Sequence, residues 1–169
     1  MNVDEFWNIV DGSRADSQEE QIEKLYNQLA QLAKTEVIDF FRHYYQFLQQ
    51  AYTWKLWGAA HVINGGCSDD WFAYFRDWLI AQGRAVYEKA LIDPESLSEV
   101  ATPEEADFED FRYVMHEVFQ DRFEQDIEEV PELVELSESK DIPDGTAWEE
   151  DELDTLFPKL TAWVQSFAE

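Results

Sequence analysis

Basic residues, cysteine and long apolar runs are all scarce in this chain of 169 residues. A single cysteine excludes an internal disulfide framework and is typical of a reducing compartment, so we expect a cytoplasmic protein. No apolar run approaches the ~20 residues that a membrane-spanning helix needs. Asp4 and Glu5 stand where a secretory signal would carry bases, so we expect no signal peptide. With 12 basic against 38 acidic residues the net charge is −26. Such a surface repels phosphate, so we expect no nucleic acid as partner. The lack of a long apolar run predicts that no membrane is a partner either.

What the chain does contain is apolar and aromatic side chains, which make up 45% and 15% of its residues. At this length roughly 70% of the unfolded chain's surface can be buried, enough for one domain with its own core. Residues 1–87 hold 12 acids and 7 bases, whereas residues 88–169 hold 26 acids, 5 bases and all five prolines. We interpret this as a single domain over 1–169, with an aromatic core in residues 1–95 and an acidic flank.

Apolar residues recur at helical spacing almost throughout, and no stretch shows the alternation of a strand. The pattern predicts an all-α fold, a single-domain bundle of about seven to nine helices. The expected helices lie near residues 3–11, 17–33, 35–52, 54–64, 69–82, 84–92, 104–123 and 153–168. We expect Asn2, Ser17 and Thr35 to cap the first three helices. Pro103 suits the first turn of the helix over 104–123.

The acidic segment, residues 124–152, is expected to be mostly irregular. Residues 124–154 hold 14 acids and one base, Lys140, and are interrupted by Pro131 and Pro143. We expect a short helical turn near residues 133–136. The last helix should dock four apolar side chains on the core: Leu156, Leu160, Trp163 and Phe167.

Four motifs stand out in the first half of the chain. They are Phe6-Trp7, the pair Trp54 and Trp57, the Gly-Gly-Cys-Ser-Asp-Asp turn at 65–70, and Tyr-Phe-Arg-x-Trp-Leu-Ile at 74–80. In these motifs the chain resembles an uncharacterised, mostly bacterial family, domain of unknown function 4240. The resemblance covers roughly residues 1–95. It implies an all-α domain and implies no reaction.

The turn at 65–70 has a structural interpretation at each of its positions. Gly65 or Gly66 supplies the positive φ that ends one helix, and Ser68 caps the next. The two aspartates that follow complement the helix dipole. Cys67 has the spacing of a hydrophobic staple with Phe72. The functional alternative is a catalytic Cys67 with a pKa lowered at the helix N-terminus. The neighbouring aspartates oppose that thiolate, and no histidine has an obvious pairing spacing.

Asp69, Ala73 and Arg76 share one stripe of the fifth expected helix, which is otherwise apolar nearly all round. In such a setting Arg76 either forms a buried ion pair or binds an anionic ligand. Asp69 is the favoured partner for an ion pair, with Glu36 and Asp39 as alternatives.

A second stripe, Trp57, His61 and Asn64, runs along the fourth expected helix toward the same turn. A cleft between the fourth and fifth helices could therefore hold a small ligand or a peptide. Its candidate residues are Trp57, His61, Asn64, Asp69, Asp70 and Arg76. The structural alternative places Trp57 in the core and His61 at its rim. No spacing is typical of a metal site or a phosphate-binding glycine loop, so we expect neither metal nor cofactor.

Three functions remain open from the sequence. The first is a non-catalytic cytosolic binding or interaction module. The second is an enzyme in which Asp69 or Asp70 acts as acid or base with His61 as partner. The third is an inhibitor or immunity-type protein whose acidic flank covers a basic protein surface.

Overall fold

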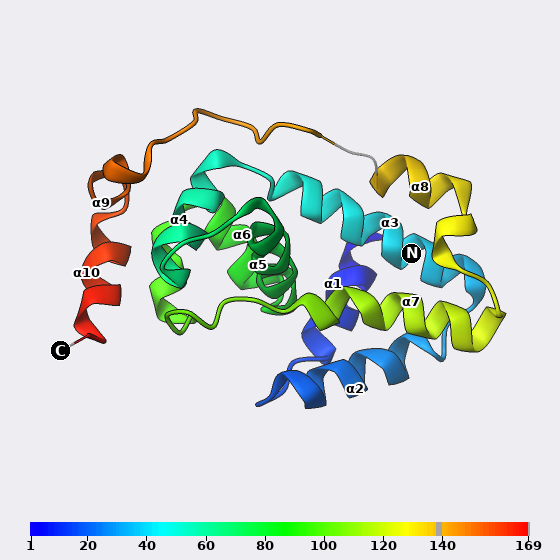
Figure 1. Cartoon of the computed structure of the whole chain (residues 1–169). Helices are drawn as coiled ribbons and strands as arrows, with labels where there is room; N and C mark the ends of the chain where they lie inside the picture. The colour runs from blue at the N-terminus through cyan, green and yellow to red at the C-terminus, as the bar shows by residue number, and fades with distance from the viewer. Residues whose placement is uncertain (138–139, 169) are drawn as a thin grey trace.

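The computed structural model describes residues 1–137 and 140–168. Within these residues nine helices have seven or more residues and no strand is present, which confirms the all-α fold class (Figure 1). The helices are α1 (Val3–Gly12), α2 (Gln18–Leu29), α3 (Lys34–Gln50), α4 (Trp54–Asn64), α5 (Asp69–Ala81), α6 (Arg84–Ile92), α7 (Glu109–Phe123), α8 (Pro131–Ser137), α9 (Leu153–Leu156) and α10 (Pro158–Ser166), with 3₁₀ turns η1 (Pro94–Glu99), η2 (Ile127–Glu129) and η3 (Glu150–Glu152). None of the helices in the described part of the chain is long and apolar enough to cross a membrane.

Helix α3 packs against α1, α5, α7 and α8, and its buried side chains include neighbours in the sequence. Phe40 and Phe41 are both fully buried although they are adjacent in sequence. Phe40 packs against Phe6 of α1, with the ring centroids 4.7 Å apart. Because α1, α5 and α7 all contact α3, side chains from distant parts of the chain meet along it.

Two of the three expected helix caps are confirmed. Asn2 and Glu5 form a capping box at α1, and the Ser17 side chain accepts a hydrogen bond from the Glu20 amide at α2. The cap expected at Thr35 is wrong, because α3 begins at Lys34 and no side chain caps it. Lys34 contacts α7 through the rings of Phe119 and Phe123, and this tertiary contact accompanies the earlier start.

The expected helix start near Pro103 is also wrong, since α7 begins at Glu109. Hydrogen bonds to α4 hold the preceding segment in a non-helical path. The Glu104 amide donates to the Ile63 carbonyl at 3.0 Å, and the Asn64 side chain bonds both backbone groups of Ala106. Glu104 has a φ of 67°, which a right-handed helix cannot accommodate. Tertiary contacts therefore override the proline signal.

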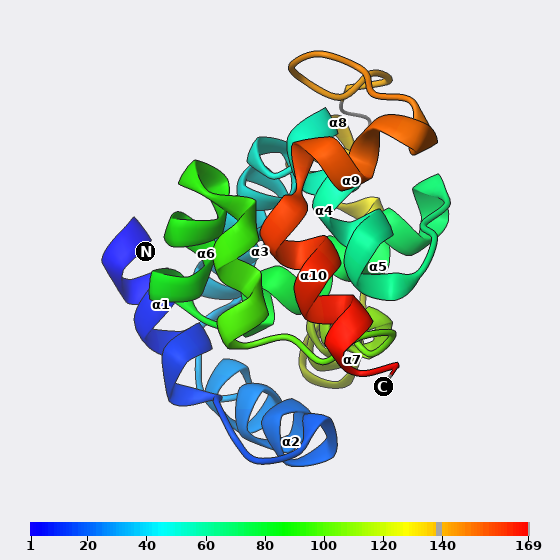
Figure 2. The same cartoon turned by 90° about the vertical axis from the view of Figure 1, so that its left-hand side faces the viewer.

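The acidic segment is more helical than expected, because α8 occupies seven residues instead of a single turn. The last expected helix is instead two, α9 and α10, since Phe157 is non-helical and Pro158 begins the second. Leu160 is buried, but Leu156 and Phe167 are 52% and 61% exposed, so their expected docking is wrong. Phe157 takes that place against α4, and α10 packs along α4 and η1 (Figure 2).

Candidate functional site

The turn between α4 and α5 has the local structure that its sequence predicts. Gly65 has a φ of 68° and ends α4 in the left-handed conformation, and Gly66 has a φ of 128°. The Ser68 hydroxyl accepts a hydrogen bond of 3.3 Å from the Trp71 amide at the start of α5. The turn of the chain from α4 to α5 is therefore sufficient to explain the presence of the two glycines and the serine.

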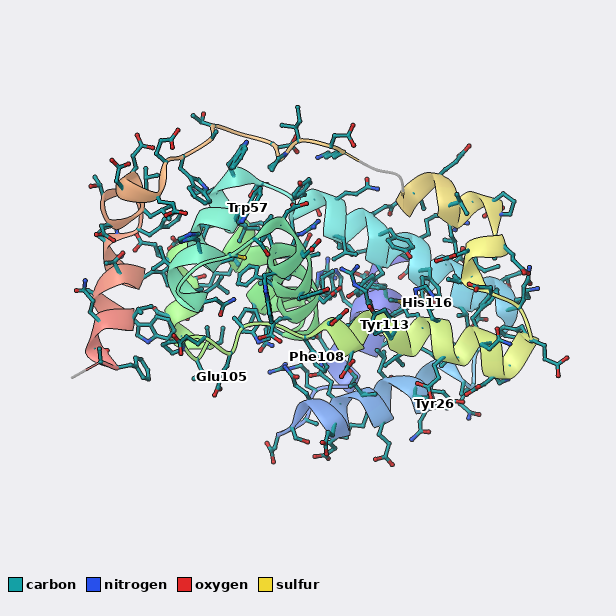
Figure 3. The ribbon with its side chains drawn as sticks, in the orientation of Figure 1. Tyr26, Trp57, Glu105, Phe108, Tyr113 and His116 are labelled. Atoms are coloured by element: carbon teal, nitrogen blue, oxygen red, sulfur yellow. The ribbon has the colours of Figure 1, made fainter. Side chains whose placement is uncertain are left out.

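Cys67 is half-buried and packs against the core. Burial is the main cause that raises the pKa of its thiol to about 12, with Arg76 opposing this shift and Asp69 adding to it. Its own carbonyl accepts a hydrogen bond of 2.9 Å from Trp57 Nε1. A catalytic cysteine would need a histidine beside it. Figure 3 shows His116 on α7, well separated from Trp57, whose indole is hydrogen-bonded to Cys67. The environment favours the thiol over the thiolate that catalysis would need.

The structure divides the expected cleft between α4 and α5 into separate hollows. Asn64 is engaged with Ala106 and lines one hollow beside Trp71. His61 lines another, where its Nε2 lies 3.5 Å from a Glu150 carboxylate oxygen. Trp57 is stacked between the rings of Trp54 and Phe72, at centroid distances of 5.1 and 5.3 Å. Trp57, His61 and Asn64 are thus not gathered with the three candidates on α5.

The three candidates on α5 do lie together, in a hollow that we call the Arg76 hollow. It has a volume of about 240 Å³ and lies among α3, α5, α7 and α8. Its lining residues are Tyr45, Leu48, Gln49, Tyr52, Asp69, Asp70, Ala73, Arg76, Arg112, Leu136 and Lys140. His61 is not among them, so the pairing of His61 with Asp69 or Asp70 that the enzyme alternative requires is not formed.

Arg76 has no carboxylate partner among the described residues, which corrects the expectation of an ion pair with Asp69. Its Nη1 donates to the Leu48 carbonyl at 3.0 Å and its Nε donates to the Phe72 carbonyl at 3.4 Å. The Leu48 carbonyl belongs to the last turn of α3, where carbonyls lack helical partners. The guanidinium carbon lies 4.5 Å from the centroid of the Tyr52 ring. Arg76 is therefore fixed by backbone carbonyls and an aromatic face.

The two alternative partners are also elsewhere. Asp39 forms ion pairs with Arg42 and with the amino group of Met1. Glu36 lines a different hollow, beside Met1 and Leu32. Arg76 therefore forms no ion pair in the described part of the chain, although the charges of Asp77 and Asp69 both act to raise its pKa. Burial lowers the pKa of Arg76, as expected for a desolvated cation without an ion-pair partner.

The buried ion pair predicted for Arg76 is formed by a different arginine. Arg112 of α7 donates from Nε to Asp77 at 2.7 Å, and the Tyr44 hydroxyl donates to the other oxygen of the same carboxylate. Asp77 is fully buried whereas the Arg112 side chain is 28% exposed, so the cost of desolvation falls mainly on the carboxylate. Burial raises the pKa of Asp77 to about 6, although Arg112 opposes that shift.

Asp69 and Asp70 lie on the side of the hollow formed by the first turn of α5. The Tyr52 hydroxyl donates to Asp69 at 3.0 Å. The Asp70 carboxylate forms neither a hydrogen bond nor an ion pair with the described residues, and it is exposed. The hollow thus has two acids on one side and the guanidinium groups of Arg76 and Arg112 on the other.

Sequence reasoning missed Arg112 and Lys140 as members of this site. Arg112 lies 36 positions after Arg76, and Lys140 follows α8, so no local spacing connects them. Lys140 also pairs with Asp144. One feature of the sequence could have pointed to them: basic residues are rare after residue 87, so each one there is a candidate for a specific role.

Metal ligation has no obvious place in the part of the chain that is described. No group of three or more His, Cys, Asp or Glu side chains there is arranged to hold a metal ion. The abundant acids are spread over the surface instead.

A comparison with protein families decides where the chain belongs. A family model described as a protein of unknown function, DUF4240, matches residues 1–121. The chain is a member of the DUF4240 family. No curated protein and no solved structure matches this DUF4240 protein.

The family match divides the walls of the Arg76 hollow into two parts. Arg76, Arg112 and the acids on α5 lie within the matched residues, whereas Leu136 and Lys140 lie beyond them. Helix α8 is attached to α3 through Gln49, whose Nε2 donates to the Leu136 carbonyl at 2.6 Å. In this DUF4240 protein the segment after residue 121 therefore completes a hollow whose charged groups come mostly from the family domain.

The rest of that segment is attached to the domain at several points. Asp144 exchanges backbone hydrogen bonds with Tyr52 and Trp54, and Trp148 Nε1 donates to the Trp54 carbonyl at 2.6 Å. Figure 1 shows residues 140–149, which lead into η3 and α9, running along one side of the molecule past α4. The acids that it carries, such as Glu149 and Asp151, are exposed. That these acids bind a basic protein surface remains a prediction.

Proposed function

We propose that this chain is a non-catalytic binding module that takes a small anionic ligand in the Arg76 hollow. The observation that carries the proposal is the placement of Arg76 in a hollow without a carboxylate partner among the described residues. A desolvated guanidinium is costly unless it gains a compensating interaction. Two backbone carbonyls supply part of that compensation and leave its net charge in place.

The second arginine strengthens the case for an anion. Arg112 lowers the pKa of Arg76, so the two guanidinium groups are close enough to repel each other. Asp77 pairs with Arg112 and also acts to raise the pKa of Arg76, so its charge partly compensates both guanidinium groups. Planar guanidinium groups match the geometry of carboxylate and phosphate oxygens, which supports a ligand with either group.

The charge of the whole molecule makes such binding selective. A chain with a net charge of −26 repels anions over most of its surface. Anion binding would therefore depend on the local cations of the Arg76 hollow. The volume of about 240 Å³ suits a small molecule better than a large cofactor.

The test is calorimetric titration with acetate and with inorganic phosphate, as probes of the two possible anionic groups. At least one of them should bind with a stoichiometry near one. Arg76→Met should weaken that binding by at least tenfold. Arg84→Met is the matched control, because Arg84 is a surface arginine paired with Asp4 and Glu88.

Three results would contradict the proposal. The first is the absence of saturable binding for both anions at concentrations that saturate ordinary weak sites. The second is equal binding by the parent protein and Arg76→Met, which would place the anion elsewhere. The third is loss of binding in Arg84→Met as well, which would show a dependence on total charge instead of on the hollow.

A further inference from the structure

The Arg76 hollow carries charges of both signs on opposite sides. Asp69 and Asp70 begin α5, and Arg76 follows two turns later on the same helix. Between them on the helix lies Ala73, which also lines the hollow. Six or seven residues of helix separate the backbone positions of the charged residues by about 9–10.5 Å along the axis.

Tyr52 connects the two sides and fixes their separation. Its ring lies 4.5 Å from the guanidinium carbon of Arg76, and its hydroxyl donates to Asp69 at 3.0 Å. The acid and the guanidinium therefore lie at different parts of one phenol side chain and do not pair directly. A direct ion pair, which would neutralise both groups, is absent among the described residues.

Asp70, on the acidic side of the hollow, also lacks an ion-pair partner among the described residues. It has no hydrogen bond or ion pair with the described residues although it lines the hollow. The hollow is thus lined by an acid and a guanidinium, neither of which forms an ion pair with the described residues. A simple anion would meet attraction at Arg76 and repulsion at Asp69 and Asp70.

We infer that the hollow binds a zwitterion, a small molecule with a carboxylate at one end and an ammonium group at the other. The inference rests on the proposed function, because it uses the same arginine for the carboxylate. The carboxylate would bind at Arg76 beside Arg112, and the ammonium group would bind at Asp70 and the free oxygen of Asp69. The ligand's two charges are separated by a short chain that lies over Ala73.

Three probes of the same chain length test this inference: 4-aminobutyrate, butyrate and n-butylamine. Each is titrated calorimetrically into the full chain at one pH and ionic strength. The zwitterion should bind at least tenfold more tightly than either singly charged probe, because only it satisfies both sides. Equal affinity for butyrate and 4-aminobutyrate would overturn the inference and leave the proposed anion site standing. Equal affinity for n-butylamine and 4-aminobutyrate would overturn both, as would no binding of any probe.

The variant Asp70→Asn gives an independent check, because it should affect 4-aminobutyrate and butyrate differently. Asp70→Asn should weaken 4-aminobutyrate at least fivefold and should leave butyrate unchanged or tighter, because a repelling charge is removed. Asp110→Asn is the control, since Asp110 is an exposed acid in the first turn of α7 that does not line the hollow. The inference fails if Asp70→Asn weakens both probes equally or weakens neither. Asp70 has no partner to lose, so folding of this variant should match the parent by circular dichroism.

Discussion

Replacing either arginine of the Arg76 hollow by methionine should lower the free energy of unfolding, but by very different amounts. Arg112→Met leaves Asp77, which is fully buried, without its ion-pair partner. Removing one partner of a buried pair costs about 3–5 kcal/mol, because the other charge stays desolvated. Arg76→Met leaves no carboxylate unpaired, so the same change on the neighbouring helix should be milder.

The cost of Arg76→Met follows from its contacts. The variant loses the hydrogen bond to the Leu48 carbonyl, and bonds from charged donors contribute roughly 1.5–3 kcal/mol. It also loses the contact with the Tyr52 ring, which a methionine sulfur replaces in part. Against these losses, a desolvated charge is removed. We expect a net loss of about 1 kcal/mol, at least ~2 kcal/mol less than for Arg112→Met.

Urea unfolding followed by circular dichroism at pH 7.5 measures both costs. Asp77→Asn should recover part of the stability lost in Arg112→Met, because it removes the charge left unpaired, and should not rescue Arg76→Met. Equal losses for the two methionine variants would refute the reasoning, since Arg76 would then have a carboxylate partner of its own. A loss below ~1 kcal/mol for Arg112→Met would refute the buried pair.

Three further outcomes follow from the structure. Gly58→Ala should destabilise the protein by about 1–3 kcal/mol in urea unfolding, because its Cβ would lie 2.7 Å from Phe157 and 3.0 Å from Trp148 Nε1; an unchanged midpoint would contradict the docking of the C-terminal segment on α4. Cys67 should react with a thiol reagent at pH 7 much more slowly than free cysteine, because burial raises its pKa to about 12; labelling as fast as free cysteine would contradict this. Burial raises the pKa of Asp77 to about 6, above its usual 3.8, so the folded state binds this proton more tightly than the unfolded state. The stability from this group should therefore be full below about pH 4 and fall by about 3 kcal/mol as pH rises through 6. Unfolding of the parent minus Asp77→Asn between pH 4 and 7.5 measures it, and a difference that grows with pH would contradict the sign.

Local features of the fold could be read from the sequence. The turn at Gly65–Ser68 is an example, because glycine conformation and serine capping depend on adjacent residues only. The start of α7 could not be read, since Asn64 and Ile63 hold residues 104–106 from another helix. Pro158 is a different case, because the break between α9 and α10 depends on local residues, but the apolar spacing around the proline favours one continuous helix.

In the candidate site, too, only the features that depend on local spacing were predictable from the sequence. Asp69 and Arg76 share one stripe of a helix, so their spacing predicts that they lie on the same side of it, and Asp70 is next to Asp69 in the sequence. Local spacing could not supply Arg112, and it gave the wrong partner for Arg76. A carboxylate near in sequence was expected, whereas the partners are carbonyls at Leu48 and Phe72. Main-chain acceptors at a helix end become available to another helix only through packing, and no residue type signals them.

The most direct test of the anion site is the Nε–Hε resonance of Arg76 in a proton–nitrogen correlation spectrum, followed during a titration with acetate. Arg84, paired with two acids on the surface, provides the internal control. The account predicts a saturable shift of the Arg76 resonance, a smaller shift for Arg112, and an unchanged Arg84. A spectrum in which Arg76 stays fixed while acetate reaches saturating concentrations, or in which Arg84 moves as far as Arg76, would contradict it.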